Sequence, residues 1–518
     1  MTKFSMTSAL GRTRWCALVV LANLFLSLAW AQPPPSANTL VVAVSALPTE
    51  LDPDFGETTE KGNVLRQVFD LPTWYDSNGV LHPWVVESWE LLNENRTYRL
   101  SIRQGLQFAS GTPVNAETVK FTFDRMTDPA MLAAGANNQF PIRVSLVSTE
   151  VVDEYTLDIN TAEPTTLVPL RLYVVFLVDP AYYEGASIRD VALTPHGGGP
   201  YRVTEFVPAE YVVLERNENY WFEIPDVERL VLRAVPERSS RLAMLETGEV
   251  DIAMDLAPDD IPLLQRIPHA KAVSIPGARR IGLVYNQRDE YFADKRVRQA
   301  LNYAVDWDEI RDTLLYGLGD RLVTYRGSDV CSSPDLLAYP YDPARALALL
   351  DEAGFPMDKK LTIDVAGNGG YRIAVLQAVA AQLGRIGLNV EVNVVEFSVY
   401  NQMITNRNFN EMIEVGLGGR GVPVQDAEVL KNGVLWHPGG WDDEQAVAFN
   451  ELLAEMEATF DEDIVCDMTK ELEALAHDGA PWLFLHRQLI VAGVNNRVDW
   501  QPRIDGQLFF RDSRWVSH

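Results

Sequence analysis

Side chains that could carry out catalysis are present in this chain, but their spacing matches no known catalytic arrangement. No two histidines stand at the spacing of metal ligands; they occupy positions 82, 196, 269, 437, 477, 486 and 518. The serine-hydrolase elbow, the zinc-protease helix motif and the phosphate-binding loop are all missing from the sequence. Carboxylates are abundant, but abundance on an acidic chain does not indicate a catalytic pair. We therefore expect a protein that is not an enzyme and that holds no metal or cofactor.

Residues suited to binding a ligand stand in two short segments. The turn AGNGG, residues 366–370, lies between a predicted strand and a helix that begins near Tyr371. Backbone N–H groups at the start of a helix attract negative charge, so Asn368 and Tyr371 are candidate ligand contacts. The alternative is an ordinary strand-to-helix turn. Trp436, in NGVLWHPGGW, is a candidate wall of the pocket, and a place in the core is its alternative.

The elements that must position these residues alternate between strands and helices. Alternating hydrophobic residues in TYRLSIR, residues 97–103, predict a strand. Asn115 is the predicted cap of the helix that follows. Residues 228–255 have the pattern of a strand, a helix and a second strand, and Asp306 with Glu309 has the spacing of a capping box. These features predict an α/β protein.

The N-terminus has the pattern of a secretory signal peptide. Lys3, Arg12 and Arg14 precede an apolar run that ends at Ala29-Trp30-Ala31, a typical cleavage site. The run is shorter than the ~20 residues that span a bilayer. Cys16 stands at the start of the run, where it cannot become the lipid-modified first residue of a lipoprotein. We therefore expect residues 1–31 to be removed and the mature protein to be free in the periplasm.

The mature chain is strongly acidic and has two cysteines. Removing the leader leaves 41 basic against 72 acidic side chains, a net charge near −31. Such a surface repels nucleic acid and anionic lipid, so neither is an expected partner. A bond between Cys331 and Cys466 is chemically possible after export. The sequence leaves this bond open and favours free thiols, because a chain of this size builds a large core without it.

Several segments resemble the peptide/nickel family of ABC-importer solute-binding proteins. GGGPYRVTEFVPAEYVVLERNENYW (197–221) is similar to that family's G-[ST]-G-P-Y segment with LERNxxYW downstream. SWELLNENRTYRLSIRQGLQFASGTPVNAETVKFTFDRM (88–126) and DKRVRQALNYAVDWDEI (294–310) resemble two further landmarks. YDPARALALLDEAGF and DGAPWLFLHRQ match two more. These landmarks occur in the family's order, and the likeness extends from about residue 40 to 510.

The resemblance implies a large two-lobed periplasmic-binding-protein fold of type II, with an extra subdomain inserted in the first lobe. The implied boundaries are lobe I over 32–76, 193–282 and 496–518, the extra subdomain over 77–192, and lobe II over 283–495. Gly197 to Pro200 would return the chain from the subdomain to lobe I, since glycine permits the backbone angles of such a return; an ordinary surface turn is the alternative. Tyr220 and Trp221 are expected to be structural aromatic residues that close a strand.

The function that the resemblance implies is solute capture in the cleft between two lobes, followed by delivery to an ABC permease with its ATPase subunits. We expect a monomer. The ligand would be a short peptide or another small polar molecule. The alternative is a periplasmic ligand sensor or a peptide chaperone on the same fold.

Arg420 is where this chain departs from the dipeptide binders of the family. Those proteins resemble one another in a GW..D segment whose Asp accepts the ammonium group of a peptide, whereas VGLGGRGVPVQDAEVL has Arg420 at that position. An arginine favours a carboxylate or a phosphate; pairing with Asp426 is the alternative. SDVCSSPDL (328–336) also departs from the family pattern, so its place in the natural sequence and the role of Cys331 stay open.

Overall fold

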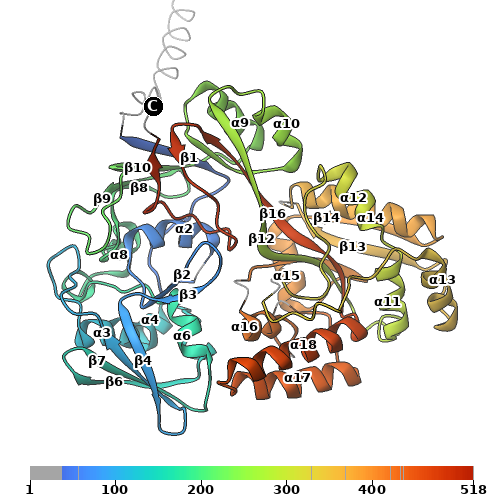
Figure 1. The fold of residues 1–518 in the computed structure, drawn as a ribbon, viewed down its shortest axis with the longest axis horizontal. Helices are drawn as coiled ribbons and strands as arrows, with labels where there is room; N and C mark the ends of the chain where they lie inside the picture. The colour runs from blue at the N-terminus through green and yellow to red at the C-terminus, as the bar shows by residue number, and fades with distance from the viewer. Residues whose placement is uncertain are drawn as a thin grey trace, which may run out of the picture.

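The computed structural model describes residues 38–516, apart from residues 57, 328–329, 368, 420–421, 432 and 436. Strands and helices alternate through this part of the chain (Figure 1), so the α/β prediction is confirmed. The predicted signal peptide and three predicted ligand contacts, Asn368, Arg420 and Trp436, lie outside the described residues. Within the described ranges no helix is both long and apolar enough to cross a membrane.

A ten-stranded mixed sheet connects the two halves of the molecule (Figure 1). Its strands are, in spatial order, β14 (Asn389–Val395), β13 (Lys360–Ala366), β15 (Met412–Leu417), β12 (Ala270–Tyr285), β16 (Trp482–Asn495), β11 (Ile252–Leu256), β1 (Thr39–Val44), β10 (Arg229–Ala234), β9 (Tyr211–Arg216) and β8 (Tyr201–Val207). β1 pairs in parallel with β10 and β11, and β13 pairs in parallel with β14 and β15. The long antiparallel strands β12 and β16 lie between these two parallel groups.

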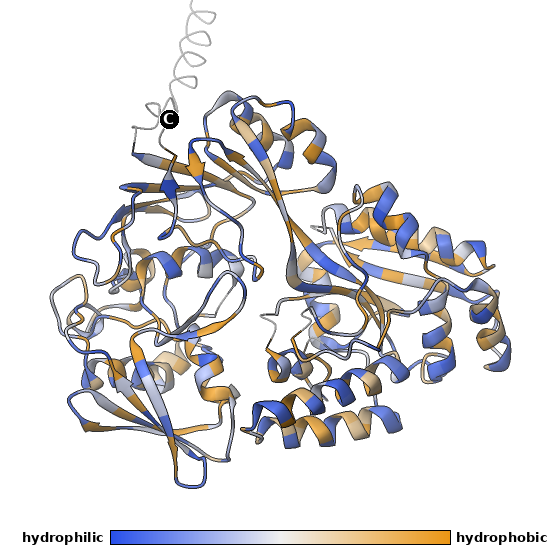
Figure 2. Ribbon diagram, viewed as in Figure 1, coloured by the Kyte–Doolittle hydropathy of each residue, from blue (hydrophilic) through white to orange (hydrophobic). Residues whose placement is uncertain are grey.

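Helices cover both parts of this sheet because each has an apolar side that needs burial. They are α2 (Thr59–Val68), α9 (Arg238–Thr247), α10 (Ile261–Leu264), α11 (Lys295–Tyr303), α12 (Trp307–Leu314), α13 (Pro343–Glu352), α14 (Tyr371–Arg385), α15 (Phe397–Asn406), α16 (Pro423–Ala427), α17 (Glu444–Glu457) and α18 (Glu462–Gly479). The outer helices carry both hydrophobic and hydrophilic residues (Figure 2). Every residue of β1 is buried, as expected for a parallel strand covered on both faces.

A separate four-stranded antiparallel sheet lies at one end of the molecule (Figure 1, blue to cyan). Its order is β4 (Val86–Leu92), β5 (Thr97–Ile102), β7 (Thr156–Thr161) and β6 (Leu146–Asp153). The helices next in the chain order are α3 (Ala116–Thr127), α4 (Pro129–Ala133), α5 (Phe140–Arg143) and α6 (Leu167–Arg171). They are followed by α7 (Pro180–Tyr183) and α8 (Ile188–Leu193), whose buried residues Tyr183 and Val191 belong to the core beside β1. Tyr98, Leu100 and Ile102 are buried in one core with Val119 and Phe123, as the alternation in the sequence predicts.

Two short strand pairs complete the described fold. They are β2 (Thr73–Tyr75) with β3 (Leu81–Pro83), and β17 (Val498–Asp499) with β18 (Arg514–Trp515). The first hairpin lies beside α6 in the view of Figure 1. The second is part of the C-terminal return, which brings the end of the chain back beside β1 and β10 (Figure 1).

The pairing of β12 with β16 is interrupted where both strands pass from one half of the molecule to the other (Figure 1). Pro276 pairs with Leu489 and Arg280 pairs with Arg487, so three residues of β12 stand opposite a single residue of β16. Within this interruption, the N–H of Ala278 donates instead to the carbonyl of Ile504 at 2.6 Å. A bulge of this kind bends a strand and ends its regular ladder, which makes this segment the point where the two halves are joined.

Gly197 and Gly199 are required by close packing rather than by unusual backbone angles. Neither has a positive φ, so the reason that the sequence suggested is wrong. A Cβ at either position would stand 2.5 Å from a backbone atom of Val68, at the end of α2. The N–H of Gly199 donates to the carbonyl of Val68 at 2.9 Å. The glycines therefore allow two backbone segments to touch.

Replacing Gly199 with alanine is expected to lower the free energy of unfolding by about 1–3 kcal/mol, because the added methyl group overlaps backbone atoms that cannot move aside. Gly384, near the end of α14, is the matched control. It has a negative φ and open space around its Cβ position, so Gly384→Ala should leave stability unchanged or raise it by about 0.5–1 kcal/mol. Thermal melts of the two variants measure the difference, and equal melting temperatures would contradict the packing argument.

Tyr220 and Trp221 are structural residues, as predicted. The Tyr220 hydroxyl and the Trp221 indole N–H donate to the carboxylate of Asp70, at 2.9 and 2.8 Å. Trp84 donates to the same carboxylate at 3.0 Å. Burial raises the pKa of Asp70 to about 6, although these three donors oppose the rise. The aromatic pair that ends the segment 197–221 thus fixes Asp70, two residues after the end of α2.

Cys331 and Cys466 form a disulfide, with their Cα atoms 4.7 Å apart. The sequence favoured free thiols, and that interpretation is wrong. The two residues are separated by 135 positions in the sequence. Local sequence patterns do not show which residues so far apart in the chain come into contact. The segment after Cys331 lies against α18, where Ser332 Oγ donates to Glu473 at 2.9 Å.

Candidate functional site

Two loops meet at the carboxyl ends of the neighbouring parallel strands β13 and β15. The register pairs Ile363 with Met412 and Asp364 with Ile413, so the loops that begin at residues 367 and 418 leave the same edge of the sheet. Ligands of α/β proteins commonly bind outside this edge. Two of the predicted contacts, Asn368 and Arg420, belong by sequence to these loops, and the described residues around them define the site.

Two arginines and one glutamate lie together beneath the loops. Arg279, in the interrupted segment of β12, donates from Nη1 to the carbonyl of Gly416 at 2.8 Å. Arg372, in the first turn of α14, donates from Nε to the carbonyl of Gly369 at 3.1 Å and forms an ion pair with Glu414 of β15. The side chain of Glu414 is only 2 % exposed. The cluster therefore joins β12, α14 and β15 at one point.

This cluster carries excess positive charge. Burial raises the pKa of Glu414, and the charges of Arg372 and Arg279 oppose that rise. Burial lowers the pKa of Arg279, and the nearby charge of Arg372 lowers it further. One buried carboxylate thus faces two guanidinium groups, while the whole chain has a net charge of −28. A local positive site on an acidic protein suits an anionic group, since the rest of the surface repels it.

A second, fully buried group of charges supports the loop after β15. Arg280 Nη1 lies 2.5 Å from Asp426 Oδ1. Arg326 lies 3.7 Å from the other oxygen of Asp426 and 3.5 Å from Glu473. The sequence left open a pair between Arg420 and Asp426. Asp426 is paired with two described arginines, and Arg420 lies outside the described residues, so its pairing with Asp426 and its contact with a ligand both stay predictions.

Tyr371 is described, and its hydroxyl is engaged by the protein. The N–H of Leu489, in β16, donates to the Tyr371 hydroxyl at 3.0 Å. Burial raises the pKa of Tyr371 to about 12, so the group is neutral at physiological pH. The bond ties the first residue of α14 to the strand that passes between the halves. A role for Tyr371 in binding a ligand stays a prediction.

The two halves of the molecule also touch away from the arginine cluster. Arg171, at the end of α6, forms an ion pair with Glu428, just after α16. Gln425 of α16 donates to the carbonyl of Leu170 at 2.9 Å. These contacts join α6, which follows β7 in the chain, to the half that contains β13 and β15 (Figure 1). They are direct contacts between the two halves.

A hollow of about 260 Å³ lies elsewhere, between α3, α7 and α8. Its walls include Arg125 and Tyr183, and three acidic side chains, Asp124, Asp128 and Glu184, belong to its lining. None of these residues belongs to the arginine cluster. Among the described residues no group of three or more His, Cys, Asp or Glu side chains could hold a metal ion.

Sequence reasoning missed Arg279, Arg372 and Glu414. A signal was present for the first, because IPGARRIGLVY places two adjacent arginines inside an otherwise apolar strand. Charged residues in such a strand are costly unless they have partners or a function. The other two gave no signal, since Arg372 occupies an ordinary first turn and Glu414 lies in the short strand EMIEVGL.

Two groups of parallel strands, joined by two long strands with an interrupted ladder, define a two-lobed binding protein of type II architecture. The chain belongs to the bacterial extracellular solute-binding proteins of family 5, because the model of that family's middle region matches residues 80–427. It is thus the solute-capturing component of an ABC import system. The members of this family are binding proteins.

The similar proteins agree on this family. The chain is 26% identical over 394 residues to the glutathione-binding protein GsiB of Shigella boydii serotype 4 (strain Sb227), which covers 76% of this chain and 75% of the relative. The GsiB protein of Escherichia coli (strain K12) gives the same identity and coverage. Among solved structures, HbpA2 from Haemophilus parasuis is 22% identical with a TM-score of 0.79, covering 93% of this chain and all of that one. NikA from Brucella suis, in complex with Fe(III)-EDTA, is 23% identical with a TM-score of 0.81, covering 92% and 100%.

Proposed function

We propose that this protein captures a peptide-like or other polar organic solute between its two lobes and delivers it to a membrane permease with ATPase subunits. The observation that carries the proposal is the arginine cluster, which lies at the carboxyl ends of β13 and β15 beside the junction of the halves. Closure of the lobes would surround the solute with preformed polar groups and exclude water. The protein acts as a monomer in the periplasm after removal of residues 1–31.

The lobes in this proposal follow the expected boundaries. Lobe I comprises residues 32–76, 193–282 and 496–518, the extra subdomain comprises 77–192, and lobe II comprises 283–495. The position of the four-stranded sheet between β3 and α6 in the chain supports the subdomain. The interruption of β12 near residue 278 supports a hinge close to the boundary between lobe I and lobe II, at residues 282 and 283.

A glutathione-like peptide fits the proposed site well. Several relatives at 26% identity are glutathione-binding proteins, and glutathione is a small peptide with two carboxylates. Arg279 and Arg372 offer guanidinium groups that suit a carboxylate. Arg420, Asn368, Tyr371 and Trp436 complete the proposed set of contacts on the sequence argument.

Mass spectrometry of whatever copurifies with the protein, released by denaturation, tests the proposal. A stoichiometric peptide or small acidic solute is the expected result. Thermal melts with glutathione and a panel of dipeptides are the second arm of the experiment. A chain that carries no solute and melts at one temperature with every compound would contradict solute capture.

The purified protein is expected to carry no stoichiometric nickel, although structural neighbours include nickel-complex binders. The reason is that the histidines and cysteines of the sequence show no ligand spacing. Elemental analysis after gel filtration measures the metal content. About one nickel per chain, retained through the column, would show that this expectation is wrong.

A further inference from the structure

Polar contacts join the end of α6, in the proposed extra subdomain, to α16 and the residues that follow it in the other half. Gln425 Nε2 donates to the carbonyl of Leu170 at 2.9 Å. Arg171 forms an ion pair with Glu428, and the two side chains are only 17 % and 9 % exposed. Leu170 and Arg171 are neighbours in the chain, and Gln425 and Glu428 are about one helical turn apart. The two contacts therefore form a single area between the halves.

A third contact involves the start of α6. Thr166, the N-cap residue of this helix, donates from its N–H and its hydroxyl to the carbonyl of Glu457, the last residue of α17, at 3.0 and 3.3 Å. All these contacts are made by polar groups, which regain water when two surfaces separate. Domains that move against each other commonly have such polar interfaces. The contact between α6 and the other half is therefore of a kind that can form and break.

On its own half, α6 is held by β2. Thr73 Oγ1 donates to the carbonyl of Pro169 at 3.1 Å, and the Tyr75 hydroxyl donates to the carbonyl of Leu170 at 3.2 Å. The carbonyl of Leu170 thus accepts from Tyr75 on one side of the junction and from Gln425 on the other. A carbonyl oxygen has two lone pairs, so both bonds can exist together. Because β2 fixes α6, the helix presents a preformed acceptor to α16.

At its other side, α16 is tied to the segment that carries the arginine cluster. Asp426, next to Gln425, pairs with Arg280 at 2.5 Å. The same guanidinium donates from Nη2 to the carbonyl of Gly418, in the loop after β15, at 2.9 Å. Arg280 directly follows Arg279, whose guanidinium belongs to the proposed site. One arginine thus joins β12, the loop after β15 and α16, so a shift of this loop toward a solute would carry α16 with it.

We propose that α6 and α16 form a latch, in which Arg171 and Gln425 are positioning residues that hold the lobes closed on the solute without touching it. This inference rests on the proposed capture of a solute between the lobes. The apparent affinity for a solute is proportional to the fraction of the protein in the form that binds it, when that fraction is small. The latch therefore raises the affinity for every solute by the same factor, while the arginine cluster determines which solute is bound.

Calorimetric titration of latch variants with several chemically different solutes tests the inference. The probes are glutathione, S-methylglutathione, Ala-Ala and Ala-Glu. Arg171→Met should weaken binding by about tenfold or more, because closure then buries Glu428 without its partner. Gln425→Ala removes one hydrogen bond and should weaken binding by about threefold to tenfold. Each variant should weaken every probe that binds by the same factor, and Arg171→Lys, which keeps the charge, should recover part of the affinity.

Arg202→Met is the matched control. Arg202 pairs with Glu215 at 3.1 Å inside the hairpin of β8 and β9, so this variant loses an ion pair that lies within one half. It should bind every probe as the wild type does. Thermal melts without solute provide a second readout. Arg171→Met should melt at the temperature of the wild type, because the latch contacts are broken in the open form that prevails without solute.

The outcomes separate the latch from the proposed function. An equal loss of affinity for all probes that bind, with unchanged melts, supports the latch. If a probe binds but both variants bind it as the wild type does, capture stands and the latch is wrong. A loss confined to one probe would show that the residue touches that solute, and a lower melting temperature of Arg171→Met without solute would show a purely structural contact; either result overturns the latch. If no probe binds and nothing copurifies, solute capture itself fails, and the latch fails with it.

Discussion

Replacing Arg298 with methionine is expected to lower the free energy of unfolding by about 3–5 kcal/mol. Arg298 belongs to α11, and its side chain is completely buried. Methionine is unbranched like the aliphatic part of arginine, so it keeps the packing of that part but removes the charge and every donor. The loss arises because the acceptors around the guanidinium stay buried without partners.

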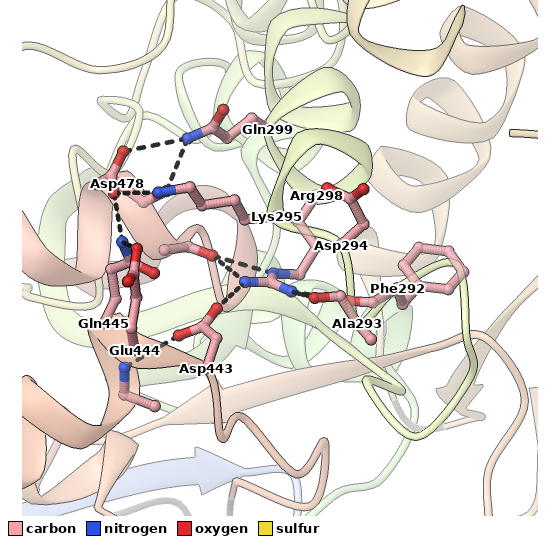
Figure 3. A network of polar contacts seen from close by, with 12 residues as sticks. Phe292, Ala293, Asp294, Lys295, Arg298, Gln299, Asp443, Glu444, Gln445 and Asp478 are labelled. Carbon is pink, nitrogen blue, oxygen red and sulfur yellow. Dashed lines mark hydrogen bonds and ion pairs between the residues drawn. The ribbon is translucent and has the colours of Figure 1, made fainter. Parts of the chain in front are cut away.

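The contacts of Arg298 explain the size of this effect (Figure 3). Its Nη1 donates to the carbonyls of Phe292 and Ala293, both at 2.8 Å. Its Nε and Nη2 donate to the carbonyl of Gly479, at 3.0 and 2.7 Å, and Nη2 also pairs with Asp443. One side chain thus joins the loop before α11 to the last residue of α18 and to the N-cap residue of α17. Burial lowers the pKa of Arg298 from its usual value, and the charge of Asp443 opposes that fall.

Lys295 provides the matched control within the same network. It belongs to the same helix and pairs with Asp478 at 2.7 Å, but both side chains are well exposed. Lys295→Met should therefore cost less than about 1 kcal/mol. Urea unfolding followed by circular dichroism measures both variants. Equal losses in the two variants would contradict the argument that burial sets the cost.

Arg420→Ala is expected to weaken the binding of the copurified solute by about 2–5 kcal/mol, or roughly 30-fold to several thousand-fold. We expect this loss of affinity because Arg420 stands where the dipeptide binders that this chain resembles have the Asp that accepts an ammonium group. Truncation would leave an anionic group of the solute buried without its partner. Lysine should recover only part of the affinity, because a point charge does not reproduce the planar fork of arginine.

Calorimetric titration of the wild type, Arg420→Ala and Arg420→Lys measures this effect, and melts without solute show whether folding changes. Arg385→Ala is the control, since Arg385 pairs with Glu309 on an exposed face of α14. Unchanged affinity in Arg420→Ala would exclude the contact with the solute. A large fall in its melting temperature without solute would instead indicate a structural role.

Local patterns in the sequence predicted local structure well. The capping role of Asn115 is confirmed, because its Oδ1 accepts from the N–H of Thr118 at 3.0 Å. The capping box predicted at Asp306 is only half formed, because the N–H of Asp306 donates to Gln382. Asp306 still caps α12 as Asn115 caps α3, accepting from the N–H of Glu309 at 3.1 Å. Each of the two capping bonds joins residues three positions apart. The information that determines such a bond is therefore present in a short stretch of sequence.

The site depends on contacts between distant residues, which local patterns do not determine. Arg279 and Gly416 are 137 positions apart, and they meet only because β12 and β15 are neighbours in the sheet. The interruption of β12 also depends on the C-terminal return, because the carbonyl of Ile504 accepts from the N–H of Ala278. The likeness to a family implied the two lobes, but the cluster of Arg279, Arg372 and Glu414 became visible only in the fold.

Small-angle X-ray scattering, with and without the solute that saturates the protein in titration, tests the central claim most directly. Capture between two lobes predicts that the saturated protein has a smaller radius of gyration than the free protein at an unchanged molecular mass. The contacts of Arg171 with Glu428 and of Gln425 with Leu170 join the two halves, and closure predicts that they break when the lobes open. Superimposable scattering curves for the free and saturated protein would contradict capture by closure of the lobes.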